Sequence, residues 1–290
     1  MITTLENEYL RIAVKSHGAE LCSLVKKVSG VEYLWQADAK FWGRHAPVLF
    51  PIVGRLQNDQ YLFKGKIYEM KQHGLARNLP FELIEQKADC LVFELTDSAE
   101  TKTSYPFSFS LRISYTLSGK RLQIGYEVLN TNDQEALHFS IGGHPAFRCP
   151  LNVEENRSDY QLVFSQKELA AKQLLDNGIR NRQIDLVLRN SRYLPISDNL
   201  FDDDALVFQH LESESVTLQR GHIAILTFHF TGFPYLGIWS KNQQSPFVCI
   251  EPWFGVADHV NHSQILKEKE GIINLTPKGT FSCAYAVEIH

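Results

Sequence analysis

The stretch "LRISYTLSGKRLQIGYEVLN", residues 111–130, alternates apolar and polar side chains on either side of Gly119. In a β-strand every second side chain points to the same face, and a glycine between two alternating runs is typical of a tight hairpin turn. The stretch therefore predicts a β-hairpin that buries one face. The side chains on that face would be Leu111, Ile113, Tyr115, Leu117, Leu122, Ile124, Tyr126 and Val128.

Short apolar or alternating runs of the same kind recur along the chain. Turn residues separate them, and no helical pattern of about 10–15 residues lies between them, so the sequence favours an antiparallel all-β sandwich over a parallel α/β fold. We expect residues 1–290 to form a single β-sandwich domain with few short helices. The runs are "YLRIAV", "AELCSLV", "CLVFELT", "YQLVF", "QIDLVL", "SVTLQR", "IAILTFHF", "YLGIWS", "FVCIEPW" and "FSCAYAVEI".

One stretch carries two conflicting signals. "SQKELAAKQLLDNG", residues 165–178, has capping-box spacing and apolar residues at helical intervals. Its Asn177-Gly178 pair is instead a strong hairpin signal, and the strand-like "QIDLVL" follows it. We predict strands here, and short helical turns at "DAKFWGRH" (residues 38–45) and "SDNLFDDDA" (residues 197–205).

Composition excludes several classes of function. The 29 basic and 33 acidic residues are mixed along the chain and give a net charge of −4, so no basic face is available for nucleic acid. The chain lacks both a signal-peptide pattern and the run of about 18 apolar residues needed to cross a membrane. Its five cysteines are widely spaced and include no C-x-x-C pair. We therefore expect a soluble cytoplasmic protein with reduced thiols; the oligomeric state is not predicted.

Five polar residues in apolar surroundings could do chemistry. Glu251 follows the apolar run "FVCI", and a carboxylate at the end of a buried strand needs either an ion-pair partner or a task. His144 lies in "GGHPAF", where it could be a structural imidazole or a ring aimed into a site. The two glycines would let the backbone turn and approach a ligand closely, which favours the second reading. The same argument holds more weakly for His73, which lies beside Gly74, and Arg55 and Asp204 are uninformative alone.

Taken together, these motifs resemble the aldose 1-epimerase (mutarotase) family, and especially its LacX-like branch. "GRLQND", "QHGLAR", "GGHPAF", "DALVF" and "VCIEPWFGVAD" occur in the family's order over nearly the whole chain. The resemblance implies a β-supersandwich with a sugar cleft, Glu251 as general base and His144 as general acid. It implies sugar-binding roles for Arg55, His73 and Asp204. The chain has "HPAF" and "EPW" where galactose mutarotases commonly have "HPYF" and "ETQ", so the resemblance does not name the sugar.

Anomer interconversion needs one base and one acid. The base removes the O1 proton while the acid protonates the ring oxygen, and the opened sugar recloses on its other face. Because the proton inventory returns to its starting point, we expect no cofactor and no metal. We expect the carboxylate of Glu251 and the imidazolium of His144 to face each other with room for C1 between them. Trp239 or Trp253 could stack on the sugar.

Three alternatives stay open. A carbohydrate-binding protein would need only the cleft and the aromatic side chains. A metal-dependent enzyme could use His259 and His262 together with His144 as ligands. Arg44 and Arg77, near the other motifs, leave open a phosphorylated hexose as substrate. A glycosidase is disfavoured, because that chemistry usually needs two carboxylates and only Glu251 is a strong candidate.

Overall fold

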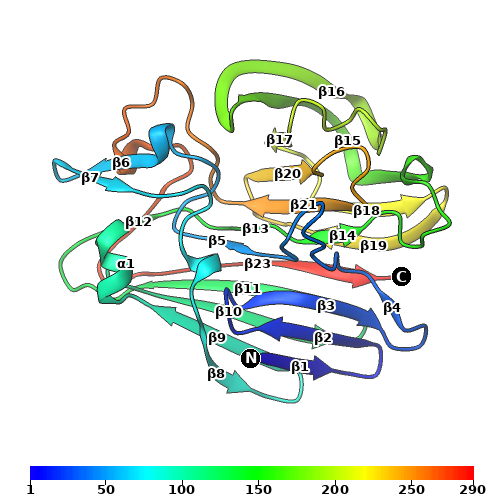
Figure 1. Ribbon diagram of the computed structural model, residues 1–290, viewed down its shortest axis with the longest axis horizontal. Helices are drawn as coiled ribbons and strands as arrows, with labels where there is room; N and C mark the ends of the chain where they lie inside the picture. Colours follow the sequence, from blue (N-terminus) through cyan, green and yellow to red (C-terminus); the bar gives the residue numbers. More distant parts are fainter.

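The computed structural model describes residues 1–290, apart from the side chain at position 182, and consists mainly of antiparallel strands (Figure 1). The predicted hairpin is confirmed: β10 (Phe109–Ser118) and β11 (Arg121–Asn130) pair with Leu117 opposite Leu122. The turn is Gly119-Lys120, where Gly119 has a φ of 56°. All eight predicted inward side chains of the hairpin are buried.

This hairpin lies inside a nine-stranded antiparallel sheet. Both of its strands have neighbours on either side in this sheet, and the inner face of each is buried because a second sheet packs against it. In spatial order the strands are β16 (Ile179–Pro195), β15 (Tyr160–Asp176), β18 (Ser215–Arg220), β19 (Ile223–His229), β23 (Thr280–Ile289), β11, β10, β9 (Cys90–Thr96) and β8 (Glu82–Gln86).

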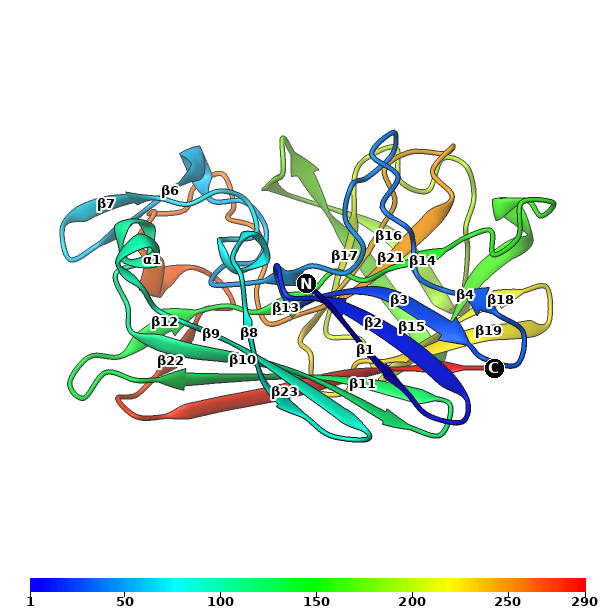
Figure 2. The same ribbon diagram turned by 60° about the horizontal axis from the view of Figure 1, so that its bottom comes forward.

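A six-stranded sheet faces the nine-stranded one, as Figures 1 and 2 show from two directions. Aromatic side chains fill the space between the sheets: Phe50 contacts Phe109 with ring centroids 5.1 Å apart, and Phe147 contacts Phe228 at 6.1 Å. The predicted β-sandwich is thus confirmed. The strands of the second sheet are β17 (Leu206–Gln209), β20 (Tyr235–Trp239), β21 (Phe247–Trp253), β13 (Gly142–Gly143) and β5 (Val48–Leu49), with β14 (Ala146–Arg148) also on β21.

Smaller elements complete the fold. A four-stranded sheet holds β1 (Ile2–Glu6), β2 (Leu10–Lys15), β3 (Glu20–Lys26) and β4 (Val31–Glu32), and two-stranded sheets pair β6 (Gln60–Phe63) with β7 (Lys66–Glu69) and β12 (Leu137–Phe139) with β22 (Ile273–Leu275). The helices are α1 (Ala99–Ser104) and the 3₁₀ turns η1 (Gln57–Asp59), η2 (Ala76–Asn78), η3 (Arg157–Asp159) and η4 (Leu266–Glu268). Within the described part of the chain, none of these helices has the length and apolar character needed to cross a bilayer.

The ambiguous stretch 165–178 forms strand, as predicted. β15 and β16 are joined by Asn177-Gly178, both with positive φ (50° and 78°), which matches the hairpin signal. The hairpin carries several register shifts and arches over the six-stranded sheet (Figure 1). The stretches 38–45 and 197–205 form hydrogen-bonded turns, and neither is assigned as a helix.

One continuous hydrophobic cluster holds side chains from Leu5 to Ile289. The cluster therefore takes residues from both ends of the chain and from both large sheets. We propose that residues 1–290 form a single domain, and this shared core supports the proposal.

Candidate active site

A cavity of about 520 Å³ opens on the outer face of the six-stranded sheet, a size that suits a small ligand. Side chains from β20, β21 and several loops line it together with the tip of the β15–β16 hairpin. The lining residues are Phe41, Trp42, Arg44, Gly54, Gln72, His73, Arg77, His144, Leu175, Gly178, Arg180, Asp204, Ala205, Val207, Trp239, Lys241, Glu251, Trp253, Val256 and Ala257.

Strand β21 brings Glu251 to this cavity by simple alternation. Val248 and Ile250 belong to the main core, so the side chains between and beyond them, Cys249 and Glu251 among them, point to the other face. Only 1% of the Glu251 surface is exposed. On the paired strand the residue opposite is Gly237, whose missing side chain leaves room for its neighbours: a Cβ there would lie 2.7 Å from the Trp253 ring.

The two glycines before His144 serve packing, which corrects the role we predicted for them. Gly142 and Gly143 form β13 and do not adopt positive φ. A Cβ on Gly142 would lie 2.6 Å from Trp253, and one on Gly143 would lie 2.9 Å from Tyr285. Glycine is therefore needed because aromatic side chains pack closely against β13, Trp253 at Gly142 and Tyr285 at Gly143, and this position holds His144 beside β21.

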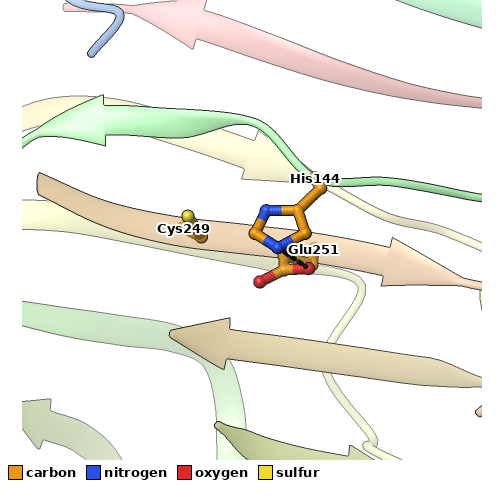
Figure 3. Close-up of side chains that lie close together, drawn as sticks. All are labelled: His144, Cys249 and Glu251. Carbon is orange, nitrogen blue, oxygen red and sulfur yellow. Dashed lines mark ion pairs between the residues drawn. The ribbon is translucent and has the colours of Figure 1, made fainter. Parts of the chain in front are cut away.

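His144 and Glu251 touch directly. His144 Nε2 lies 3.2 Å from Glu251 Oε2 (Figure 3), so the predicted gap for a sugar carbon between the two groups is wrong. Glu251 comes from β21 and His144 from the short connection between β13 and β14, both of which pair with β21, and the two side chains pack against each other within the cavity wall. A sugar must therefore meet the pair from the cavity side or move the two groups apart.

Burial pushes both groups of this pair towards their neutral forms. Desolvation, together with the nearby charge of Asp204, raises the pKa of Glu251 well above its usual range. Desolvation and the charge of Arg77 lower the pKa of His144 to about 3. These directions favour a carboxylic acid beside a neutral imidazole, whereas we predicted a carboxylate beside an imidazolium. In both descriptions the pair holds one transferable proton.

Aromatic side chains hold the His144 ring in place. Trp42 stacks on it with centroids 4.7 Å apart and planes 25° apart, and Trp239 and His73 meet it edge-on at 5.6 Å each. Within the described part of the chain, His144 Nδ1 is buried and has no hydrogen-bond partner. The ring is thus oriented by packing and by its contact with Glu251. The sequence pointed to Trp239 but not to Trp42.

His73 and Asp204 also reach the cavity. His73 is buried, and its Nδ1 accepts a hydrogen bond from the backbone N–H of Gly54 at 3.2 Å, so in the neutral ring the proton sits on Nε2. Burial and the neighbouring His144 hold the pKa of His73 well below its usual value. Asp204 is exposed at the mouth, where one carboxylate oxygen accepts from the N–H of Ala205. The two residues therefore offer one donor and one acceptor.

Arg55 and the C-terminal histidines lie elsewhere. Arg55 is not among the lining residues; its Nε donates to Asp59 at 2.9 Å, and its Nη1 donates to the carbonyl of Asn177 at 3.0 Å. His262 Nδ1 lies 3.4 Å from Asp258. In the described residues the metal-ligating group that contains His144 includes neither His259 nor His262, so the metal site that we considered for these three histidines is wrong. Trp253 lines the cavity beside Trp239.

Three arginines line the cavity, and they differ in their partners. Arg180 is buried and donates to Glu270 at 2.8 Å. Arg44 and Arg77 form no ion pair within 4.0 Å among the described residues; Arg44 donates to Asn78 at 2.6 Å and Arg77 to the carbonyl of Gln72 at 2.6 Å. Burial and the charge of Arg44 lower the pKa of Arg77 to about 10. The charge of Glu20 acts on Arg77 from beyond ion-pair distance, but among the described residues neither guanidinium group has a carboxylate in direct contact.

Comparison with known proteins identifies the family. A family model for aldose 1-epimerase matches residues 1–272. The chain belongs to the aldose 1-epimerase family. The chain is 35% identical to the chromosomal LacX protein of Lactococcus lactis subsp. lactis, covering all of this chain and 99% of that protein, so the predicted resemblance to the LacX-like branch is confirmed.

Solved structures of similar proteins have the same fold. A galactose mutarotase related enzyme from Lactobacillus acidophilus has a TM-score of 0.95 and 35% identity, covering 100% of this chain and 97% of that one. A galactose mutarotase-like protein from Lactobacillus casei has a TM-score of 0.92 and 31% identity, with all of both chains covered. The aldose 1-epimerase fold of this chain is therefore shown independently of the residues in its cavity.

Proposed function

We propose that the chain is a mutarotase, an isomerase that interconverts the α and β anomers of an aldose. The observation that carries this proposal is the contact between His144 and Glu251, two proton-exchanging groups 3.2 Å apart and buried in the wall of a sugar-sized cavity. Family membership supports the same reaction class. Activity on any particular sugar is part of the proposal.

The reaction needs two proton transfers on one edge of the sugar. One group of the pair accepts the proton of the O1 hydroxyl while the other donates a proton to the ring oxygen, and the C1–O5 bond breaks to give an aldehyde. Rotation about C1–C2 and the reverse transfers close the ring with the other anomeric configuration. Since the pair holds one proton before and after turnover, either group can start as the donor. His144 and Glu251 are well placed for this because the cavity wall excludes water from both.

The rest of the cavity offers groups for sugar hydroxyls. The Nε2–H of His73 can donate to a sugar hydroxyl, and the exposed Asp204 can accept. Trp239 offers an apolar ring against which the C–H face of a sugar can stack. Arg55 ion-pairs with Asp59 behind the hairpin tip at the rim, so any sugar contact of Arg55 would require its side chain to turn.

Polarimetry with freshly dissolved α- and β-anomers tests the proposal. We expect the protein to speed mutarotation of at least one aldose and Glu251→Gln to lower that rate by about 10²–10⁴-fold. Tight sugar binding without rate enhancement would instead support a carbohydrate-binding protein. EDTA should leave the rate unchanged, since the chemistry requires only proton transfer; loss of activity restored by zinc would contradict this mechanism.

A second candidate is a mutarotase for phosphorylated aldoses. Arg44 and Arg77 favour it, because the two guanidinium charges repel each other, neither has an ion pair within 4.0 Å among the described residues, and a phosphate would pair with both. For this candidate, kcat/KM for a hexose 6-phosphate should exceed that for the free hexose, and Arg77→Gln should erase the difference. Arg121→Gln, remote in sequence and on β11, serves as the charge-matched control.

A further inference from the structure

Three side chains in the cavity wall form a compact group of possible metal ligands. A ring nitrogen of His144, the Sγ of Cys249 and a carboxylate oxygen of Glu251 all lie within 4.8 Å of one another (Figure 3). Cys249 and Glu251 are two residues apart on β21 and so share its outer face, and His144 approaches that face from the segment after β13. All three residues are buried.

The donor set selects one class of ion. Thiolate, imidazole and carboxylate together suit Zn²⁺ and similar thiophilic divalent cations, whereas Mg²⁺ and Ca²⁺ prefer oxygen donors alone. Zinc accepts such ligands at about 2.0–2.3 Å in a tetrahedron, and small side-chain rotations can bring three atoms within 4.8 Å of one another to those distances. The cavity beside the group would supply water as the fourth ligand.

We propose that His144, Cys249 and Glu251 bind a thiophilic divalent cation such as Zn²⁺, and that the bound ion blocks the catalytic pair. Binding releases the thiol proton and the carboxyl proton into solvent, and no electron is transferred. Glu251 Oε2 is buried without a hydrogen bond in the described part of the chain, so it has an acceptor position open for a cation. The inhibitory effect rests on the proposed function; the binding does not.

The charges around the site make the thiolate of Cys249 necessary for cation binding. Arg44 and Arg77 line the same cavity and oppose a cation, while Asp204 at the mouth favours one. A thiolate and a carboxylate together cancel the two charges of the ion, and a site with only Glu251 and His144 would lack this balance. We therefore expect binding to be lost when Cys249 is replaced, although Cys249 does not line the sugar cavity itself.

Cobalt and zinc titrations of the EDTA-treated, metal-free protein test the proposal. Wild type should show a thiolate-to-cobalt charge-transfer band with one equivalent of Co²⁺, and Zn²⁺ should displace the cobalt and inhibit mutarotation. The isosteric Cys249→Ser protein should lose both the band and the zinc inhibition and keep most of its activity. Cys283→Ser, in which a thiol on β23 is removed, should behave as wild type.

Each outcome decides the proposal. Absence of the band in wild type, or equal zinc inhibition of wild type and Cys249→Ser, would overturn it. Should Cys249→Ser fail to fold, Glu251→Gln serves instead: its cobalt affinity should fall at least about tenfold, because a neutral amide replaces an anionic ligand, and unchanged affinity would count against the site. Since the band and the affinity are measured without substrate, they remain decisive if the protein proves not to be a mutarotase.

Discussion

Two buried carboxyl groups, Glu251 and Asp258, lie seven residues apart and are treated in opposite ways by the fold. Asp258 accepts from Lys269 Nζ and from the N–H of Gln57, each at 2.9 Å, and lies 3.4 Å from His262 Nδ1. These partners lower its pKa, so the carboxylate stays charged. Glu251 Oε2 has no hydrogen bond among the described residues, and burial raises the pKa of its carboxyl group.

The difference separates a structural ion pair from a reactive one. Lys269 also donates to the carbonyl of Val256, so the Asp258 cluster fixes the loop that closes one side of the cavity. Both carboxylate oxygens of Asp258 and the ammonium of Lys269 have partners in the cluster, so the charges of this salt bridge are satisfied within the protein. At the pair of Glu251 and His144, by contrast, polar capacity is left unused next to a cavity, as expected where a substrate supplies the missing partners.

The largest effect should follow replacement of Glu251. We expect Glu251→Gln to lower kcat for mutarotation by about 10²–10⁴-fold, because the amide keeps the shape and loses the transferable proton. The melting temperature should change little, since Glu251 Oε2 forms no hydrogen bond that the amide would lose. Polarimetry and thermal denaturation on the same preparation measure both. A folded Glu251→Gln protein with a wild-type rate would remove Glu251 from the mechanism.

Replacement of Asp258 should show the opposite pattern. Asp258→Ala leaves the ammonium of Lys269 buried and without its counter-ion, so the free energy of unfolding should fall by about 3–5 kcal/mol. The protein that remains folded should keep most of its kcat. Chemical denaturation gives the stability, and the double variant Asp258→Leu with Lys269→Met is the control: removal of both charges should restore much of the loss. An unstable double variant would contradict this account of the pair.

Acid should affect the two sites differently. The pKa of Asp258 is lowered on folding, so its stabilisation is complete above the unfolded value of about 3.9 and is lost as pH falls below it. The proposed reaction instead needs one proton on the Glu251–His144 pair. The pKa of His144 is lowered to about 3 and that of Glu251 is raised, so near neutral pH Glu251 carries the shared proton and His144 is neutral. At low pH His144 is also protonated, the pair then holds two protons, and activity should fall.

At high pH activity should fall as Glu251 loses the proton that the pair shares. His144 thus controls the low-pH side of the pH-rate profile and Glu251 the high-pH side. A carboxylate paired with an imidazolium would give the reverse assignment. NMR of ¹⁵N-labelled histidine tests our assignment directly: the His144 ring should stay neutral between pH 5 and 8. Titration of His144 near its ordinary pKa of about 6.5 would contradict our assignment.

The sequence predicted much of the fold because the strongest signals are local. The alternation around Gly119 and the Asn177-Gly178 turn lie within the strands that they define, and both hairpins formed as predicted. The role of Gly143 was misjudged because its constraint comes from Tyr285, a residue far away in the sequence that packs against β13. Local patterns do not report such a contact.

The candidate site shows the same limit. His144 and Glu251 could be selected as residue types in apolar surroundings, but their direct contact depends on strand order in the six-stranded sheet, which alternation does not reveal. Trp42 was missed because it lies in an irregular turn, where an aromatic side chain carries no periodic signal. Arg55 was selected from a motif; its ion pair with Asp59 is local, but its bond to the carbonyl of Asn177 at the hairpin tip joins residues far apart in the sequence, and no local pattern reports it.

The smallest effect should follow replacement of Trp42. This variant tests whether packing holds the Glu251–His144 pair in position, as hydrogen bonds hold Asp258. Hydrogen bonds hold Asp258 in position, whereas His144, the partner of Glu251, has a buried Nδ1 without one in the described residues and is held by the stacked Trp42 ring. We expect Trp42→Leu to lower kcat roughly tenfold, less than the about hundredfold cost of a 1 Å misplacement, because Trp239 and His73 still flank the ring. KM should change little, and Trp42→Phe should recover most of the rate by restoring a flat stacking surface. Trp42 would be an ordinary core residue if Trp42→Leu lost stability without a lower kcat at an unchanged KM. The same conclusion would follow if Trp42→Phe failed to restore the rate.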